Sequence, residues 1–193
     1  HEDNPFLGFR AIRMTLSHPE IFRPQLRAIL RAAAYGDVRV MFPMIGSMDQ
    51  LREAKALLRE QEQTLQAEGV PTGPVKVGMM VEIPAAAVLA EEFAKEVDFF
   101  SIGTNDLTQY TLAVERGNAA VAHLYAPEHP AVLRLIAMTA QAAAERHIPC
   151  GMCGEAAGDP KLAPAFVGMG VNELSMSPRR VPAVRKLLSG LTM

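Results

Sequence analysis

Short apolar stretches alternate along the chain with longer stretches in which apolar residues recur every three or four positions. The short stretches are nearly continuous in apolar residues and predict five β-strands, at residues 38–44, 75–82, 97–102, 148–153 and 171–176. Near-continuous apolarity is typical of strands that are covered on both faces, as in a parallel sheet. The pattern therefore predicts an α/β fold in which helices alternate with parallel strands.

The longer stretches carry helix start signals. Ser47 is expected to cap a helix after the first strand, with Gln50 three residues later completing a capping box. The apolar stripe of this helix is Leu51, Ala54, Leu57, Leu58 and Leu65.

Prolines mark the starts of the other predicted helices, because proline fits the first helical turn. These helices are expected at residues 19–36, from Pro84 onward, and at residues 130–147. In the helix from Pro84, the side chains of Val88, Leu89 and Phe93 are spaced to face the sheet. Residues 68–74, rich in glycine and proline, are expected to form a surface loop.

Polar residues cluster where the predicted strands end. Glu82, Asn105–Asp106, Cys153 and Ser175–Ser177 lie at carboxyl ends of strands or just beyond them. In a (β/α) barrel these ends converge on one mouth, where catalytic groups gather. Five strands would also suit an open doubly wound sheet, but this placement favours a TIM-type barrel. We expect residues 1–193 to be the C-terminal portion of one such barrel domain, with about five of its eight βα units.

Composition and charge narrow the possible partners. The 193 residues are 49% hydrophobic and 21% charged, as in a globular protein. Nineteen basic and 21 acidic residues give a net charge of −2, so neither nucleic acid nor an anionic membrane is an expected partner. We see no membrane-spanning run and no signal peptide. Two cysteines are too few for a disulfide scaffold, which favours a reducing, cytoplasmic location.

Two carboxylates follow successive predicted strands. Glu82 ends the apolar strand before Pro84, and Asp106 follows the break of the next strand. Mg²⁺ binds few protein oxygens and takes its other ligands from water and substrate, so the pair is a candidate Mg²⁺ site. The simpler alternatives are a charge beside a helix N-terminus for Glu82 and a helix cap for Asn105 and Asp106.

Binding of an anion to a chain with this charge requires individually placed arginines. Arg116 stands beside a glycine turn, where it is either a surface residue or a clamp for phosphate or carboxylate. Arg10 and Arg13 are similar candidates, and solvation of one of them is the simpler interpretation.

Cys150 and Cys153 form a Cys-x-x-Cys pair, but a zinc site would need two further ligands and the sequence has no second pair. Residues three apart in a strand also point to opposite faces. Cys153, at the strand end, is therefore a candidate active-site acid, and the alternative is a buried core thiol. The histidines show no ligand spacing and are interpreted as structural. They are His1, His18, His123, His129 and His147.

Five runs of the sequence carry a resemblance in combination. They are Asn4-Pro-Phe-Leu-Gly-Phe-Arg10, Met79-Met-Val-Glu82-Ile-Pro, Gly103-Thr-Asn-Asp-Leu-Thr-Gln-Tyr110, Arg116-Gly-Asn and Gly151-Met-Cys-Gly-Glu. Together they resemble one enzyme family, Enzyme I of the bacterial phosphoenolpyruvate-dependent sugar phosphotransferase system. The resemblance extends from Asn4 to about Leu188. Pyruvate phosphate dikinase and phosphoenolpyruvate synthase share its Glu-x-Pro and Asn-Asp-Leu-Thr-Gln elements, whereas residues 110–118 and 151–155 are more similar to Enzyme I.

The resemblance implies roles for the candidate residues. Glu82 and Asp106 would bind Mg²⁺, which bridges the carboxylate and phosphate of phosphoenolpyruvate in the family. Asn105 and Asp106 would contact the substrate, Arg116 would hold its phosphate, and Arg10 would line the same pocket.

The resemblance also implies a reaction and partners. Cys153 would deliver a proton to C3 of the enolate. The phosphoryl group would pass to a histidine on a separate N-terminal domain, which serves the histidine-containing phosphocarrier protein and sugar uptake, and pyruvate would be released. A homodimer is implied, and the chain alone is expected to be inactive.

Three alternatives differ from this interpretation. The chain could be a domain of the pyruvate phosphate dikinase or phosphoenolpyruvate synthase type, or an inactive fragment that serves as a dimerisation module. It could also be an aldolase-like lyase of the related Mg²⁺-dependent barrels, although these lack the cysteine run.

Overall fold

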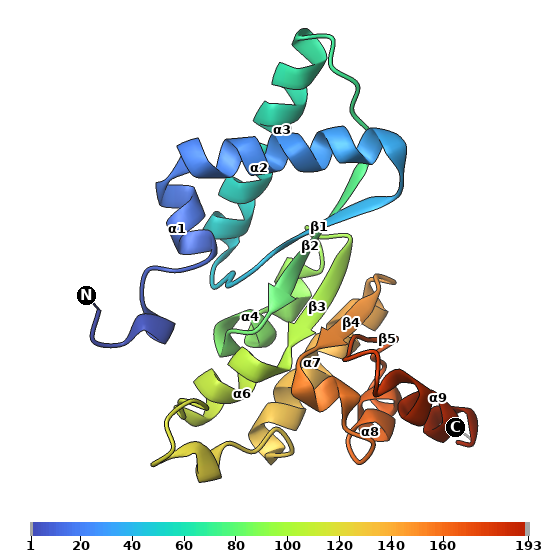
Figure 1. Ribbon diagram of the computed structural model, residues 1–193. Coiled ribbons are helices and arrows are strands. Elements are labelled where there is room, and N and C mark those ends of the chain that lie inside the picture. Colours follow the sequence, from blue (N-terminus) through green and yellow to red (C-terminus); the bar gives the residue numbers. More distant parts are fainter. Residues whose placement is uncertain (1, 192–193) are drawn as a thin grey trace. The chain divides into compact units, whose positions relative to one another are not determined.

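The computed structural model describes residues 2–191 (Figure 1). The chain divides into two compact units, one up to Met79 and one from Met80 onward. In both units the strands pair in parallel and alternate with helices, which confirms the predicted α/β class. The boundary between the units falls inside strand β2 (Val75–Val81), so the assignment of all residues to one domain stays a prediction.

The first unit combines three α-helices with the parallel pair β1 and β2. In Figure 1, α2 lies across α3, and the two helices are joined by the ion pairs Arg23–Glu60 and Arg27–Glu68. The elements are η1 (Pro5–Leu7), α1 (Ile12–Ser17), α2 (Pro19–Ala32), η2 (Ala33–Tyr35), β1 (Val38–Phe42), α3 (Met48–Ala67) and β2.

The start of α3 is capped as predicted, with one difference. Ser47 Oγ accepts a hydrogen bond from the Gln50 backbone N–H at 3.3 Å. The Gln50 side chain accepts from Gly46 N–H at 2.9 Å, one residue before the donor that a capping box uses. The predicted stripe of α3 is buried at Leu51, Ala54, Leu58 and Leu65, and Leu57 is half-buried.

In the second unit each strand pairs with the next one in the chain, β3 with β4 and β4 with β5. Helix α7 packs on β3 and β4, and His129 Nδ1 caps its start by accepting from Ala131 N–H at 3.2 Å. The elements are α4 (Pro84–Val88), α5 (Ala90–Phe93), β3 (Phe99–Gly103), α6 (Thr104–Leu112), η3 (Ala122–Leu124), α7 (Pro130–Glu145), β4 (Cys150–Cys153), η4 (Glu155–Gly158), α8 (Ala163–Gly168), β5 (Glu173–Leu174) and α9 (Val181–Ser189).

The helix predicted from Pro84 differs from the structure. The backbone leaves helical geometry at Leu89 (φ −99°, ψ 19°), which separates α4 from α5. The buried side of α4 and α5 is formed by Ala86, Ala87, Ala90 and Phe93, so Val88 and Leu89 are 58% and 44% exposed and do not face the core. Phe93 is fully buried as predicted.

The last predicted strand, at residues 171–176, is reduced to the two residues of β5. Its backbone hydrogen bonds nevertheless extend on both sides, from Asn172 N–H to Cys150 O at 3.0 Å and from Ser175 N–H to Met152 O at 2.8 Å. The segment therefore follows β4 over most of its predicted length. None of the helices among residues 2–191 combines the length and apolar character needed to cross a membrane.

Candidate functional site

Glu82 directly follows β2 and is buried, with 4% of its surface exposed. The end of β3 lies against it, because a Cβ on Gly103 would stand 2.9 Å from Glu82 Oε2 and 2.9 Å from Met80 Sδ. The absence of a side chain at Gly103 therefore makes room for the carboxylate. A buried carboxylate is costly unless its charge is compensated, so this position differs from a solvated surface charge.

The thiol of Cys153 lies within electrostatic range of both predicted carboxylates. Cys153 ends β4 opposite Gly103 in the strand register. Burial raises the pKa of the Cys153 thiol, and the negative charges of Glu82 and Asp106 raise it further, against a hydrogen bond with Ser101 that lowers it. Both carboxylates thus act on this thiol, and the structure brings these three predicted site residues together.

The two cysteines lie on opposite faces of β4, as predicted from their spacing. Cys150 is 1% exposed, and burial raises the pKa of its thiol to about 12. Cys153 is half-buried. Within residues 2–191, no group of three or more His, Cys, Asp and Glu side chains is arranged to hold a metal ion.

Asn105 connects the first turn of α6 to the turn that follows β4. Helix α6 begins at Thr104 with Gly103 as its N-cap, so Asn105 does not cap its own helix. Instead, Asn105 Oδ1 accepts from Glu155 N–H at 3.1 Å, and Thr104 Oγ1 donates to Cys153 O at 2.8 Å. The first residues of α6 therefore hold the turn that follows β4.

Gly154 makes this close approach possible. Its backbone has φ 100° and ψ 178°, a conformation essentially restricted to glycine. A Cβ there would clash with Thr104 Oγ1 and would lie 3.0 Å from Asn105 Oδ1. The second glycine of the Gly-Met-Cys-Gly run is thus required by the turn beside Cys153.

Arg116 lies in the exposed segment after α6. Its backbone N–H donates to Oε1 of Gln109 at 3.1 Å, and the Gln109 side chain is itself buried in α6. The position alone fits both a surface arginine and an anion clamp.

Tyr125 lies beside the candidate site, and the sequence did not indicate it. It is half-buried, and its hydroxyl donates to Asn105 O at 3.4 Å. Burial raises the pKa of Tyr125, a hydrogen bond with Thr108 and then the charge of nearby Arg116 lower it, and the charges of Glu155 and Asp106 raise it. The hydroxyl therefore lies within electrostatic range of both Arg116 and Asp106. Tyr125 belongs to none of the sequence motifs, and we find no local signal that would have identified it.

The two N-terminal arginines belong to the first unit. Arg13 Nη1 donates to Leu7 O at 2.8 Å and to Gly8 O at 3.1 Å, so it closes the N-terminal turn. The Arg10 guanidinium lies 5.5 Å from the centre of the Phe6 ring, a cation–π contact. Of the two, Arg13 has a structural role, and Arg10 remains the candidate.

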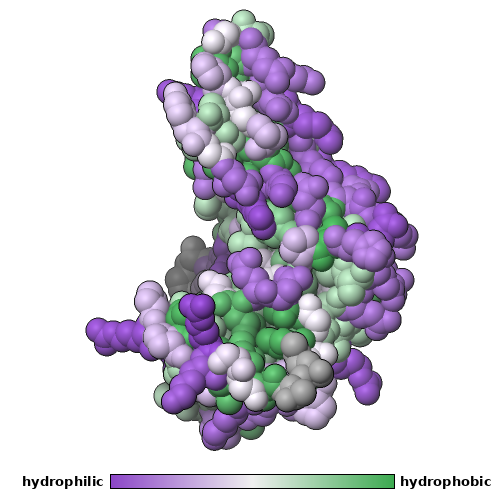
Figure 2. Space-filling model, turned by 90° about the vertical axis from the view of Figure 1, so that its right-hand side faces the viewer, coloured by the Kyte–Doolittle hydropathy of each residue, from purple (hydrophilic) through white to green (hydrophobic). Residues whose placement is uncertain are grey.

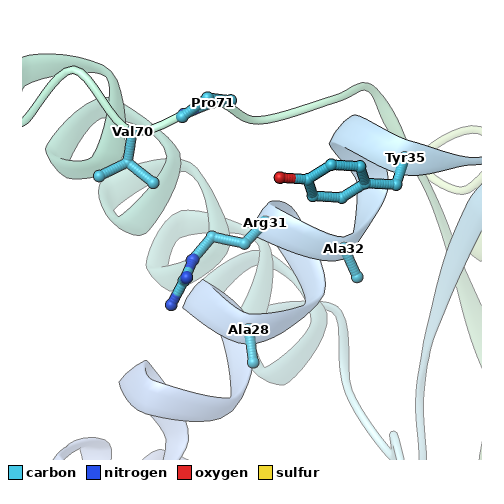
Figure 3. Close-up of a pocket in the computed structure, with 6 residues that line it drawn as sticks. All are labelled: Ala28, Arg31, Ala32, Tyr35, Val70 and Pro71. Atoms are coloured by element: carbon cyan, nitrogen blue, oxygen red, sulfur yellow. The ribbon is translucent and has the colours of Figure 1, made fainter.

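A surface pocket of 260 Å³ lies in the first unit, between the end of α2 and the loop before β2. Figure 3 shows the Tyr35 hydroxyl directed into the space between Arg31 and Pro71. No predicted site residue lines this pocket, so it is separate from the candidate site. Its lining residues are Ala28, Arg31, Ala32, Tyr35, Val70 and Pro71.

The histidines make local contacts. His18 Nδ1 lies 3.0 Å from Glu20 Oε1, and His129 caps α7. His1 lies outside the described residues.

Comparison with protein-family models identifies the family to which the chain belongs. A family model described as PEP-utilising enzyme, PEP-binding domain, matches residues 1–193. The chain belongs to this family. It is similar to curated phosphoenolpyruvate-protein phosphotransferases, with 54% identity over 191 residues to that of Bacillus sp. (strain S) and 52% over 192 residues to that of Bacillus subtilis (strain 168). These alignments cover 98% and 99% of this chain. The resemblance to Enzyme I is thereby confirmed.

The chain spans about a third of the length of these curated relatives, 33% and 34% respectively. A third relative, from Latilactobacillus sakei, is 55% identical over 191 residues, with 98% of this chain and 33% of that protein covered.

Solved structures with low sequence identity share the fold. A citrate lyase from Burkholderia xenovorans LB400 aligns with a TM-score of 0.63 at 22% identity, over 86% of this chain and 53% of that one. An HpcH/Hpal aldolase/citrate lyase family protein from Burkholderia cenocepacia J2315 gives 0.56 at 21% identity, over 89% and 68%. These neighbours are TIM-barrel-like, which agrees with an α/β fold built on a parallel sheet.

Proposed function

We propose that this chain is the phosphoenolpyruvate-binding part of an Enzyme I-type phosphotransferase. The enzyme transfers the phosphoryl group of phosphoenolpyruvate to a histidine on a separate domain and releases pyruvate. The observation that carries the proposal is the convergence of Glu82, Asp106 and Cys153 in a chain whose whole length matches a PEP-binding domain. The proposed partners are that phosphohistidine domain, the histidine-containing phosphocarrier protein and a second copy of the enzyme, in a cytoplasmic system for sugar uptake.

Glu82 and Asp106 fit a Mg²⁺ ion. Both offer oxygen donors, and Mg²⁺ is typically held by one or two carboxylates together with substrate phosphate and water. The thiol of Cys153 is too soft to be a ligand. The burial of Glu82 supports the proposal, because a divalent cation would compensate a charge that is costly to bury. Bound there, the ion would supply positive charge against the charge that develops on the phosphoryl group and the enolate.

The remaining polar residues bind and orient the substrate. Arg116 holds the phosphate, since a guanidinium matches the geometry of phosphate oxygens. Asn105 uses its Oδ1 for Glu155 N–H, so its amide Nδ2 is the donor for a substrate oxygen. By the resemblance to Enzyme I, Arg10 is proposed as a second positive charge for the substrate.

Cys153 supplies the proton that completes pyruvate. When the phosphoryl group leaves, the P–O bond breaks and its electron pair stays on the enolate oxygen. The enolate then collapses to a ketone as C3 takes a proton from Cys153 Sγ, and water later returns a proton to the thiolate. The raised pKa of Cys153 favours this role, because the thiol keeps its proton near neutral pH until C3 accepts it.

We further propose that the fold is a TIM-type barrel, of which this chain forms about five of eight βα units. The pairing of strands with their successors in the chain and the TIM-barrel-like neighbours support this architecture. The site residues then share the mouth at the carboxyl ends of the strands.

The test of the Mg²⁺ site uses Glu82→Ala and Asp106→Ala in the full-length protein. We expect each to lower phosphoenolpyruvate-dependent pyruvate formation by at least ~10²-fold, the typical cost of losing one charge-stabilising group. Circular dichroism should be unchanged. Glu91→Ala, which removes an exposed carboxylate of α5, is the matched control and should retain activity. If either site variant kept near-normal Mg²⁺-dependent turnover, the carboxylate that it lacks would be only a charge at the start of a helix and not a Mg²⁺ ligand.

A further inference from the structure

We infer that Gln109 and Tyr125 form a clamp that positions Arg116 for the substrate phosphate. Both are positioning residues, which act through Arg116 and through the segment that carries it. This segment, residues 113–125, follows α6, and we call it the arginine segment. The inference rests on the proposed function, in which Arg116 holds the phosphate.

Gln109 holds the start of the arginine segment through two oxygens. Its backbone carbonyl accepts from Val114 N–H at 3.0 Å, where α6 ends in a left-handed residue, Ala113 (φ 53°). Its side-chain Oε1 accepts from Arg116 N–H at 3.1 Å. Gln109 is only 4% exposed, so its amide is held in place by the surrounding core. The main chain of Arg116 is thus fixed by a rigid side chain of the preceding helix.

Tyr125 holds the other end of the segment. Its hydroxyl donates to the carbonyl of Asn105 at 3.4 Å, in the first turn of α6. The same hydroxyl is within electrostatic range of Arg116 and Asp106. Tyr125 therefore attaches the end of the arginine segment to the first turn of α6, within electrostatic range of Arg116 and Asp106, to which the proposal assigns substrate phosphate and Mg²⁺.

Arg116 needs such a clamp because its surroundings are open. The residues from Glu115 to Ala120 are all exposed. An arginine on a free loop loses both backbone and side-chain entropy when it binds a ligand, and this loss weakens binding. Fixing the main chain on both sides of Arg116 removes part of that cost before the substrate arrives.

The test uses Gln109→Met and Tyr125→Phe in the full-length protein. Each variant keeps the size of the side chain and removes its hydrogen bond. We expect each to raise the KM for phosphoenolpyruvate about fivefold, the factor that one net hydrogen bond implies, with a smaller effect on kcat. Gln141→Met, an exposed glutamine of α7, and Tyr35→Phe, an 89% exposed tyrosine of the first unit, are the matched controls and should behave as wild type.

Combination with Arg116→Ala separates positioning from general stability. If the clamp acts through Arg116, then Gln109→Met and Tyr125→Phe should change KM by less than about twofold in the Arg116→Ala background. A full fivefold effect in that background would overturn the inference. If Arg116→Ala itself left KM unchanged, the proposed role of Arg116 would fail instead, so the two failures are distinguishable.

Trypsin provides a readout that does not depend on activity. Cleavage after Arg116 requires local opening of the arginine segment, so both clamp variants should be cut there about fivefold faster than wild type. Mass spectrometry identifies the cleavage at the Arg116–Gly117 bond. An unchanged cleavage rate in both variants would show that the two hydrogen bonds do not hold the segment.

Discussion

Cys150 and Cys153 are two thiols of one strand whose surroundings give them different chemistry. Cys150 is buried, and desolvation alone raises its pKa. Cys153 lies at the strand end, where Ser101 and two carboxylates also act on it. Because alternate residues of a strand face opposite sides, only the second thiol reaches the carboxyl-end site. The difference in position predicts a difference in function.

Replacing each thiol by a hydroxyl separates these roles. In the full-length enzyme, Cys153→Ser should lower pyruvate formation by ~10²–10⁴-fold, the usual contribution of a general acid, because a hydroxyl holds its proton more tightly. Affinity for phosphoenolpyruvate should change little. Cys150→Ser should cost about 1–2 kcal/mol of stability and leave turnover intact. Steady-state kinetics of both variants tests this, and equal losses of turnover would mean that the two thiols act together.

The raised pKa of Cys150 predicts a dependence of stability on pH. The ordinary value of 9.0 rises to about 12 in the folded chain, so the unfolded chain releases this proton first. The contribution to stability is complete below pH 9 and is lost as the pH rises toward 12, by up to about 1.4 kcal/mol per pH unit. Urea unfolding between pH 8 and 10.5 should show a shallower decline for Cys150→Ala.

Val132→Ala is the control for that measurement, since it removes buried volume from α7 without an ionisable group. It should lower stability at every pH and keep the slope of wild type. If Cys150→Ala also kept that slope, titration of another group would account for the alkaline loss.

Among the residues of the candidate site, those that follow strand ends can be picked out from the sequence, whereas those that approach from elsewhere in the chain cannot. Glu82, Asp106 and Cys153 could be found because parallel strands bring their carboxyl ends to one edge. Tyr125 could not, since its contact with Asn105 spans a segment whose path no local pattern determines. Ser101 was missed because it lies inside a strand, where only the strand register places it near Cys153.

At the scale of elements, the site depends on how the turn after β4 meets the start of α6. Thr104 and Asn105 hold this turn by side-chain hydrogen bonds, and Gly154 allows their close approach. The pattern of apolar residues predicted α3 and its cap, because the apolar stripe of α3 repeats over consecutive turns of one unbroken helix. It placed Val88 and Leu89 in the core wrongly, because Ala86, Ala87 and Ala90 occupy the buried side of α4 and α5 instead.

Gly154→Ala tests the turn, with Gly69→Ala as its control. Both glycines have positive φ, 100° and 70°, but only at Gly154 would a Cβ meet other atoms. We expect a loss of about 1 kcal/mol for Gly69→Ala from backbone strain alone. Gly154→Ala should lose roughly 3 kcal/mol, since overpacking adds to strain. Chemical denaturation measures both, and equal losses would mean that the turn relaxes around the added methyl group.

At the scale of the whole molecule, unpaired strand edges and apolar surface favour association. Within residues 2–191, β1 and β5 each pair with one neighbouring strand. Figure 2 shows a group of hydrophobic side chains within an otherwise mainly hydrophilic face. Leu7 and Val88 are 64% and 58% exposed. Open strand edges and exposed apolar side chains are the features through which chains pair or aggregate.

Expressed by themselves, these 193 residues should therefore form dimers, swapped dimers or larger aggregates. They should also release no pyruvate rapidly from phosphoenolpyruvate, because a sheet of about five strands does not close into an eight-stranded barrel. Size-exclusion chromatography with light scattering gives the oligomeric state, and a coupled assay follows pyruvate. Val88→Lys, which replaces an exposed apolar side chain by a charge, should reduce association if apolar contact drives it and leave it unchanged if strand edges do. A monomeric chain that releases pyruvate rapidly would overturn the prediction, since it would mean that these strands complete a working site by themselves.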